Sequence, residues 1–379
     1  MNKKIDYWLL IIVGVLLILG ILILSSVSAG FSQEKFGKTT YFLFHQLLIG
    51  IIPGLVIGFI IFKLRLETLK KLSPYLISIA ILFMLVVFIP GLGIVSGGAP
   101  RWMNLGFATF QPSEFLKFTF IIYLAAWLVN PAKREKFIKD PKQIGKSLRH
   151  RIINEFLGLA PFLSVISVVI VLLVFQNDMS TLMVIVGTAI VMYFMATTPV
   201  WHSILVILLC SGGSLLFIRM FPFRMKRILV FLNPNADPMG IGYQIKQIII
   251  AIGSGGVFGL GLGASVQRFG FIPQTMADSI FAIYAEELGF IGSFILVVLY
   301  LFLLWRGFLI FKKSKDNFSK FISVGIGFWL CFQGFFNIGA MIGLLPLTGI
   351  PLPFISYGGS HIIAELSSIG LLLNISKRC

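Results

Sequence analysis

Three carboxylates stand close together in a chain that has few acidic residues. Asp278, Glu286 and Glu287 fall within ten positions, whereas all 379 residues include only 14 Asp and Glu against 31 Lys and Arg. Carboxylates can accept a proton or bind a divalent cation. The glutamates begin an apolar run, where a helix N-terminus stabilises negative charge, so we expect a structural role for them first and a cation-binding role second. Asp278 lies eight residues upstream, and we expect an exposed, chemically active carboxylate.

A second set of charges lies inside an apolar segment. Pro112 opens the segment, and Glu114 and Lys117 follow on one face of the predicted helix, three residues apart. Charges within a membrane span are costly, so they usually pair and face a polar cavity. We therefore expect an ion pair that lines a cavity, with a purely structural pair as the alternative.

Two further polar clusters stand where apolar segments meet. The sequence QNDMST places Asp178 just before an apolar run, where its side chain is expected to cap a helix. In 346–366, three prolines and the pair Gly358-Gly359 precede Glu365. Proline and glycine there predict a rigid bend at the entrance of a span, and we expect it to line a site rather than form a simple turn.

Membrane-spanning helices must position these polar residues. The chain is 58% hydrophobic and 12% charged, with a mean hydropathy of +0.98, which excludes a water-soluble globular protein. A helix needs about 20 apolar residues to cross a bilayer. Stretches that approach this length are 7–28, 42–62, 74–94, 113–129, 156–176, 179–197, 201–219, 288–311, 321–345 and 354–374. The sequence thus predicts an all-α polytopic membrane protein, one domain over 1–379, with about ten spans and a large loop, 219–287, between spans seven and eight.

The basic residues predict the orientation. Segments on the side of both termini hold 21 Lys and Arg, eight of them in the loop 130–155, and segments on the other side hold nine. By the positive-inside rule we expect cytoplasmic termini and an external 219–287 loop. This distribution also accounts for the net charge of +17 and argues against nucleic acid as a partner. The three cysteines and four histidines show no metal-binding or redox spacing.

The loop 219–287 combines glycines with basic residues. The run GSGGVFGLGLG, 253–263, lacks the spacing of a nucleotide-binding motif. It is either a flexible connection or irregular backbone that another helix or a lipid substrate approaches closely. Its flanks predict half-buried amphipathic segments along the outer membrane face, with basic groups able to bind phosphate. These groups are Arg224, Arg227, Lys246 and Arg268.

Together these clusters resemble the SEDS proteins (shape, elongation, division and sporulation), a family that includes RodA, FtsW and SpoVE. The resemblance covers essentially the whole chain, and the motif wording is slightly nearer to FtsW. The matching residues are Arg101-Trp102, Gly106, Gln111–Glu114, Lys117, Gln176, Asp178, Gly242–Gln244, Gln247, the glycine run, Asp278, Ile280–Ala282, Glu286–Gly289, Gly349–Phe354 and Ser356–Ser360.

The resemblance implies a peptidoglycan glycosyltransferase that polymerises lipid II on the outer face of the bacterial cytoplasmic membrane, in cell division or elongation. It implies a class B penicillin-binding transpeptidase and other proteins of the division or elongation complex as partners. The family's key acid, in a Thr-Asp-Phe sequence of the large external loop, corresponds to Asp278. Residues expected to support the active site are Arg101, Glu114 and Lys117, and those expected to bind substrate are Arg227, Gln244, Gln247, Arg268, Ser356 and Tyr357.

The sequence departs from the family pattern around this acid. Met276-Ala277-Asp278-Ser279 replaces His-Thr-Asp-Phe, Gln274 stands where Glu often follows the proline, and His361 replaces Ser. The acid itself is retained, so these departures bear on substrate positioning rather than on the class of reaction.

The implied reaction converts an α-linked pyrophosphate donor into a β-linked product, for which one inverting displacement is the simplest route. Asp278 would serve as the general base for the 4-hydroxyl of the acceptor. Arg, Lys or a divalent cation, Mg²⁺ or Mn²⁺, would neutralise the departing pyrophosphate. Candidate ligands of such a cation are Asp278, Glu286 and Glu287.

Two other function classes compete with this interpretation. A lipid II flippase would use the polar residues within the spans as a passage, and a non-catalytic scaffold would leave Asp278 without a role. A transporter would be expected to show inverted repeats, and the sequence shows no internal symmetry of that kind.

Overall fold

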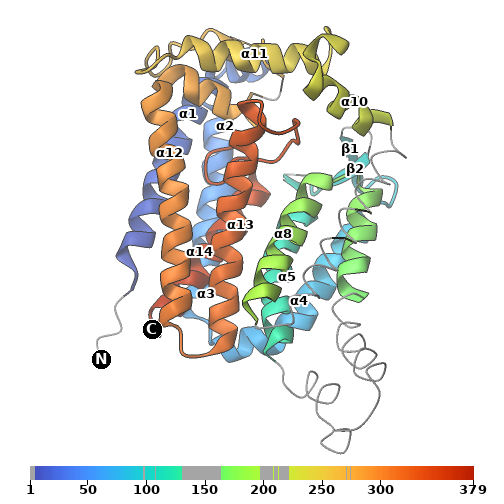
Figure 1. Ribbon diagram of the computed structural model, residues 1–379, viewed down its shortest axis with the longest axis vertical. Helices are drawn as coiled ribbons and strands as arrows, with labels where there is room; N and C mark the ends of the chain where they lie inside the picture. Colours follow the sequence, from blue (N-terminus) through green and yellow to red (C-terminus); the bar gives the residue numbers. More distant parts are fainter. Residues whose placement is uncertain are drawn as a thin grey trace, which may run out of the picture.

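The computed structural model is a bundle of helices packed side by side (Figure 1). It describes residues 5–96, 99–106, 108–129, 164–196, 208, 212, 222–269, 271–273 and 275–379, with the backbone alone at 96, 222–224 and 269. Among these residues, five helices are long and apolar enough to cross a membrane. They are α1 (Tyr7–Phe36), the continuous segment Tyr41–Lys63, α4 (Leu66–Val86), α12 (Ile280–Lys313) and α13 (Asn317–Met341).

Shorter helices complete the bundle. The segment Tyr41–Lys63 consists of α2 (Tyr41–His45), the π-helical turn η1 (Gln46–Ile51) and α3 (Ile52–Lys63). The others are α5 (Pro112–Leu128), a helix at Ser164–Phe175, α8 (Met179–Met195) and α14 (Gly359–Ser376). Each predicted span within the described residues overlaps a helix. The predicted span 201–219 falls almost wholly outside those residues and the loop 130–155 entirely so, and the number of ten spans stays a prediction.

Two predicted span boundaries were wrong. The span placed at 74–94 is α4, which begins at Leu66 and ends at Val86, with Pro74 inside the helix. A proline at the start of an apolar run resembles a helix start, but here charged residues form the preceding turns. The span placed at 288–311 belongs to α12, which begins at Ile280. Both glutamates, Glu286 and Glu287, therefore lie within that helix rather than at its start.

A small antiparallel sheet interrupts the all-α pattern that the sequence predicted. It contains β1 (Gly93–Ser96), β2 (Ala99–Asn104) and β3 (Thr109–Phe110) in the order β1-β2-β3. Ile94 pairs with Trp102, and Met103 pairs with Phe110. The sheet presents Arg101 from β2 and leads directly into α5.

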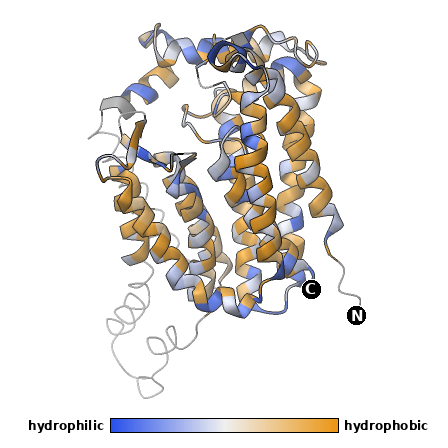
Figure 2. Cartoon of the chain, turned by 180° about the vertical axis from the view of Figure 1, so that it is seen from behind, coloured by the Kyte–Doolittle hydropathy of each residue, from blue (hydrophilic) through white to orange (hydrophobic). Residues whose placement is uncertain are grey.

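The two ends of the bundle differ. The start of α1 and the end of α14 lie at one end, whereas α11 (Ile241–Ser254) lies across the other end with α10 (Pro222–Leu232) beside it (Figure 1). Hydrophobic residues cover the lengths of the long helices, and hydrophilic residues gather toward the helix ends (Figure 2). Large apolar side chains are exposed on the outer helices, for example Phe59, which is 61% exposed. This arrangement is that of a multi-pass membrane protein.

The glycine run packs against an unwound turn of α12. Gly289 has φ 67° and ψ −164° inside the helix, and the N–H groups of Leu260 and Gly261 donate to the carbonyls of Glu286 and Glu287, each at 3.0 Å. A Cβ at Gly259, where φ is +82°, would lie 2.1 Å from the carbonyl oxygen of Glu287. The run is therefore irregular backbone approached closely by another helix, which was the second of the two interpretations.

Candidate active site

Asp278 lies at the end of the bundle that carries α11, two residues before α12 begins. Its side chain is partly buried, and Oδ1 is enclosed with no hydrogen-bond partner among the described residues. We call residues 346–358 the Pro/Gly segment; a Cβ at its Gly349 would lie 3.5 Å from Oδ2 of Asp278. The expectation of an exposed carboxylate was wrong, because this segment, about 70 residues downstream, packs against it.

Burial raises the pKa of Asp278 from its ordinary value to about 6. The backbone N–H groups of Asp278 and Ser279 and the positive charge of Arg227 favour the ionised form, but they offset only part of this effect. At neutral pH the carboxylate is mostly ionised and more basic than an exposed aspartate, which suits a general base.

Three consecutive backbone carbonyls, ending with that of Asp278, accept hydrogen bonds from the C-terminal part of the chain. Their donors are the N–H of Tyr357 to Met276 (2.8 Å), Oγ of Ser356 to Ala277 (2.5 Å) and Nδ2 of Asn337 to Asp278 (2.7 Å). The backbone of the acid is thus fixed against the Pro/Gly segment and α13.

Two arginines bring positive charge to this site. Nη1 of Arg227, on α10, donates to the carbonyl of Leu347 at 2.9 Å. Burial lowers the pKa of Arg227, the charge of Asp278 opposes that change, and the charge of Arg101 adds to it, so Arg227 lies within electrostatic reach of both groups. The guanidinium of Arg101 donates to the carbonyls of Gln176 and Asn177. Arg227 and the carboxylate together offer a group that can bind phosphate beside a proton acceptor.

The other residues expected to bind substrate divide into two groups. Nε2 of Gln244, on α11, donates to Oγ of Ser279 at 3.1 Å, next to Asp278. The side chain of Gln247, on the same helix, is partly buried and makes no hydrogen bond in the described part of the chain. Arg268 is placed elsewhere, with Nη1 at 3.4 Å from Oγ of Ser26. The structure does not describe the side chain of Arg224.

Comparison with known proteins identifies the family of the chain. A family model described as a cell cycle protein, which covers FtsW, RodA and SpoVE, matches residues 7–379. The chain belongs to this family, the SEDS proteins.

Relatives are similar over nearly their full lengths. The chain is 38% identical over 372 residues to the stage V sporulation protein E of Bacillus subtilis (strain 168), covering 98% of this chain and 97% of the relative. It is 33% identical over 375 residues to the probable peptidoglycan glycosyltransferase FtsW of Coxiella burnetii, covering 98% and 96%. The motifs were slightly nearer to those of FtsW, but the sequence identity to the sporulation protein is higher. The identities therefore do not favour FtsW over the sporulation protein.

Solved structures show the same fold. A chain of a structure described as a peptidoglycan synthase complex that coordinates polymerization and crosslinking superposes with a TM-score of 0.74 at 25% identity, covering 98% of each chain. The rod shape determining protein RodA of Thermus thermophilus gives 0.69 at 24% identity, covering 98% of this chain and 97% of that one.

In this SEDS chain the two glutamates connect α12 to the loop 219–287 and to α1. Glu286 accepts hydrogen bonds from Oγ of Ser265 and from the N–H of Val266, and Oε1 of Glu287 accepts one from Oγ of Ser26 at 2.5 Å. Both side chains are almost fully buried. Within the described ranges there is no group of three or more His, Cys, Asp or Glu that could hold a metal ion. These contacts agree with the structural role that the sequence predicted first.

The predicted intramembrane ion pair is present. Nζ of Lys117 lies 2.8 Å from Oε2 of Glu114 and donates to Oε1 of Gln333 at 2.8 Å. Nε2 of Gln333 in turn donates to the carbonyl of Pro351 at 3.0 Å, so the pair connects to the Pro/Gly segment. The indole N–H of Trp329 also donates to Oε1 of Gln333, at 2.8 Å.

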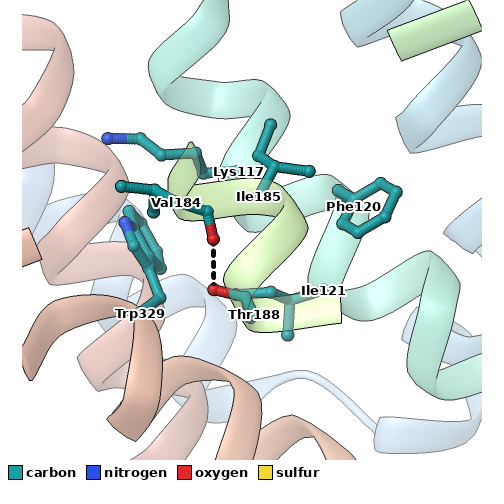
Figure 3. Close-up of a pocket in the computed structure, with 7 residues that line it drawn as sticks. All are labelled: Lys117, Phe120, Ile121, Val184, Ile185, Thr188 and Trp329. Atoms are coloured by element: carbon teal, nitrogen blue, oxygen red, sulfur yellow. Dashed lines mark hydrogen bonds between the residues drawn. The ribbon is translucent and has the colours of Figure 1, made fainter. Parts of the chain in front are cut away.

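The surroundings of Lys117 are packed rather than open. The pocket beside it is lined by residues of α5, α8 and α13, which are Lys117, Phe120, Ile121, Val184, Ile185, Thr188 and Trp329 (Figure 3). The enclosed space is too small for a water molecule, and Lys117 lies 5.2 Å from the ring centre of Trp329. The expectation that the ion pair lines a polar cavity is therefore wrong for this pocket, since its other walls are apolar except for Thr188.

The structure contains both the predicted helix cap at Asp178 and the predicted bend in the Pro/Gly segment. Oδ1 of Asp178 accepts the N–H of Thr181 at 3.1 Å, which confirms the helix cap before α8. In the Pro/Gly segment, Phe354 has φ 63°, and its N–H donates to Oε2 of Glu365 at 2.8 Å. Nδ1 of His361 lies 3.2 Å from Oε1 of the same glutamate. Glu365 therefore holds the bend in the shape that packs against Asp278.

Sequence reasoning missed the amides that support the site. Gln333 and Asn337 on α13 bind backbone carbonyls, and Gln46 bonds to Ser356 and Gly358 through Nε2 and Oε1. An amide within an apolar span was a usable signal, because such a group is expected to find a buried partner. The identity of that partner was not visible in the sequence.

Proposed function

We propose that the protein is a peptidoglycan glycosyltransferase that polymerises lipid II, with Asp278 as the general base. The observation that carries this proposal is the position of Asp278, enclosed by the Pro/Gly segment and within electrostatic reach of the positive charge of Arg227. Relatives named probable peptidoglycan glycosyltransferase, such as the FtsW of Coxiella burnetii, support the reaction class.

The proposed step is an inverting displacement. The acceptor 4-hydroxyl attacks the anomeric carbon of the donor, a C–O bond forms, and Asp278 takes the hydroxyl proton. The bond to the undecaprenyl pyrophosphate breaks at the same time, and the leaving group carries away the electron pair. Arg227 and Arg101 offer charge for the departing pyrophosphate, and the fixed backbone of Asp278 holds the base in place.

A divalent cation does not fit the donor set at this site. Asp278 interacts with the positive charge of Arg227. Glu286 is engaged with the loop and Glu287 with Ser26 of α1. Over the described ranges no group of three or more possible ligands is present. No step of the proposed reaction is assigned to Mg²⁺ or Mn²⁺.

We propose that the site faces the outer side of the bacterial cytoplasmic membrane, with ten spans and cytoplasmic termini. Asp278 lies at the end of the bundle opposite to the start of α1 and the end of α14 (Figure 1), and the basic residues favour a cytoplasmic location for the termini. The likeness to a chain of a peptidoglycan synthase complex supports a class B penicillin-binding transpeptidase as the partner.

The structure gives less support to the two alternatives. A flippase would need a passage past the intramembrane charges, but the pocket beside Lys117 has no room for water. A scaffold would not require a partly buried carboxylate whose backbone carbonyl and two preceding carbonyls are all held by hydrogen bonds.

The test is polymerisation by the purified full chain in liposomes supplied with lipid II. Wild type should make glycan strands, and Asp278→Asn should lower the rate by about 10²–10⁴-fold while lipid II binding remains. Asp237→Asn is the matched control, since Asp237 is in the same loop but pairs with Lys226 at 3.1 Å. Near-normal synthesis by Asp278→Asn would contradict the general base assignment, and absence of strands from wild type would contradict the reaction.

A further inference from the structure

Asn337 lies on the buried side of α13 and bonds to two backbone carbonyls at once. Its Nδ2 is 2.7 Å from the carbonyl oxygen of Asp278 and 2.7 Å from that of Ile350. The side chain is 1% exposed. Both contacts are to acceptors, so the amide nitrogen must face them, because the reverse orientation would place oxygen against two oxygens.

We propose that Asn337 is a positioning residue for Asp278. By joining the carbonyl of Asp278 to that of Ile350, its amide fixes the backbone of the acid relative to the Pro/Gly segment and α13. This inference rests on the proposed function, and it adds a residue that does not itself touch the substrate.

The carboxylate depends on its backbone for its position. Oδ1 has no hydrogen-bond partner in the described part of the chain. The N–H groups that stabilise the negative charge of the carboxylate are those of Asp278 and Ser279 themselves. A shift of the backbone therefore moves the carboxylate with it. A displacement of about 1 Å can lower a rate by about 10²-fold.

Ser356 supports the neighbouring peptide in the same way. Its Oγ donates to the carbonyl of Ala277 and accepts the N–H of Leu352 at 2.8 Å. The only hydroxyl hydrogen is thus used within the protein. Ser356, which the family resemblance suggested as a substrate-binding residue, is assigned here to positioning as well.

α13 provides a second amide four residues earlier. Nε2 of Gln333 donates to the carbonyl of Pro351 at 3.0 Å, next to the Ile350 carbonyl that Asn337 binds. Residues four apart lie on one face of a helix, so the two amides hold consecutive carbonyls of the Pro/Gly segment. Asn337 differs from Gln333 because it also reaches Asp278.

The chain offers a matched control for Asn337. Asn374 on α14 is 3% exposed, and its Nδ2 also donates to two carbonyls, those of Ile61 at 2.9 Å and Leu64 at 2.7 Å. These contacts lie near the termini, at the other end of the bundle. Replacing either asparagine by leucine removes a buried amide that bonds to two carbonyls, so both variants should lose stability. The carbonyls of Ile61 and Leu64 keep the N–H of Leu64 and Nη2 of Arg378 as donors.

The experiment compares Asn337→Leu and Asn374→Leu as full-length protein in liposomes. We measure thermal stability, kcat and KM for lipid II, and hydrogen exchange in peptides covering 276–282 and 347–358. Asn337→Leu should lower kcat by about 10–10²-fold with KM unchanged and should speed exchange in both peptides. Asn374→Leu should lower stability to a similar extent while kcat and exchange in these peptides stay at wild-type values.

Two results would overturn the positioning role. One is unchanged exchange at 276–282 in Asn337→Leu, and the other is a loss of kcat that Asn374→Leu reproduces. If Asn337→Leu does not give monodisperse protein, Asn337→Asp, which has the same size and at most one donor, is measured instead. Hydrogen exchange can be measured on protein without activity. A wild type that makes no glycan would therefore contradict the proposed function, and the exchange measurement would still test the role of Asn337.

Discussion

Lys117 and Glu114 form an ion pair of 2.8 Å in which both side chains are almost fully buried, at 3% and 2% exposure. Such a pair is costly to break from one side, because the remaining charge loses its partner in a medium of low dielectric constant. Gln333 extends the pair toward the Pro/Gly segment, so its integrity bears on both folding and the site.

The first prediction concerns this pair. Glu114→Gln or Lys117→Met alone should destabilise the protein by about 3–5 kcal/mol, and the double variant should cost less than the sum of the two. Folded yield, thermal stability and polymerase rate are measured for all four proteins of the cycle. Strictly additive effects would mean that the two side chains do not interact.

The second prediction concerns the pH dependence of the reaction. Asp278 must be ionised to accept a proton, and burial raises its pKa to about 6. The value of kcat/KM should therefore rise with pH through this region and be about 10-fold lower at pH 5 than at pH 8. The residual rate of Asp278→Asn should lack this step, and a wild-type profile that is flat between pH 5 and pH 7 would exclude Asp278 as the base.

The third prediction concerns stability. The pKa of Asp278 is about 6 in the folded protein against an ordinary value of 3.8, so between these values the folded state binds more protons than the unfolded state. Stability should then fall as pH rises from 4 to 6 and stay low above 6. Asp278→Asn avoids this loss and should be more stable than wild type at pH 8, by at most about 3 kcal/mol, but equal at pH 4.

Thermal unfolding in detergent at the two pH values checks this expectation. Asp237→Asn serves as the control, because its carboxylate bonds to Lys226 and to the N–H of Ile241 and should give no gain at pH 8. A variant Asp278→Asn that is less stable than wild type at pH 8 would show that the ionised carboxylate is not destabilised by burial.

The fourth prediction concerns orientation. Met239, in the turn before α11, is 94% exposed, and Lys315, between α12 and α13, is exposed at the other end of the bundle. With the three native cysteines replaced, a cysteine at Met239 should react with an impermeant thiol reagent in intact cells. A cysteine at Lys315 should react only after the membrane is opened. The reverse pattern would place Asp278 in the cytoplasm.

The sequence predicted those features that depend on local composition. Apolar runs located the helices, and the cost of charge in a span predicted the partner of Lys117. The short strands around Arg101 escaped notice, because two to six residues carry too little pattern to be recognised. The start of α12 was missed because Glu286 and Glu287 looked like helix-end residues. Tertiary partners, in the loop for Glu286 and on α1 for Glu287, allow them to be buried inside the helix.

The surroundings of Asp278 could not be predicted for a different reason. Its covering segment and Asn337 lie 59 or more residues away in sequence, and no periodicity records which distant segments meet. The sequence identified the acid through the family motif, but its enclosure, and therefore its raised pKa, follows only from tertiary packing.

The hydrogen bonds to Met276, Ala277 and Asp278 also bear on biosynthesis. Their donors, on Asn337, Ser356 and Tyr357, are all made after the acid itself. Chains emerge from the ribosome N-terminus first, at about 5–20 residues per second, so the loop carrying Asp278 is complete seconds before the residues that hold it. The carboxylate therefore reaches its working position only after Tyr357 has been made, and a chain released before that residue would carry the acid without its support.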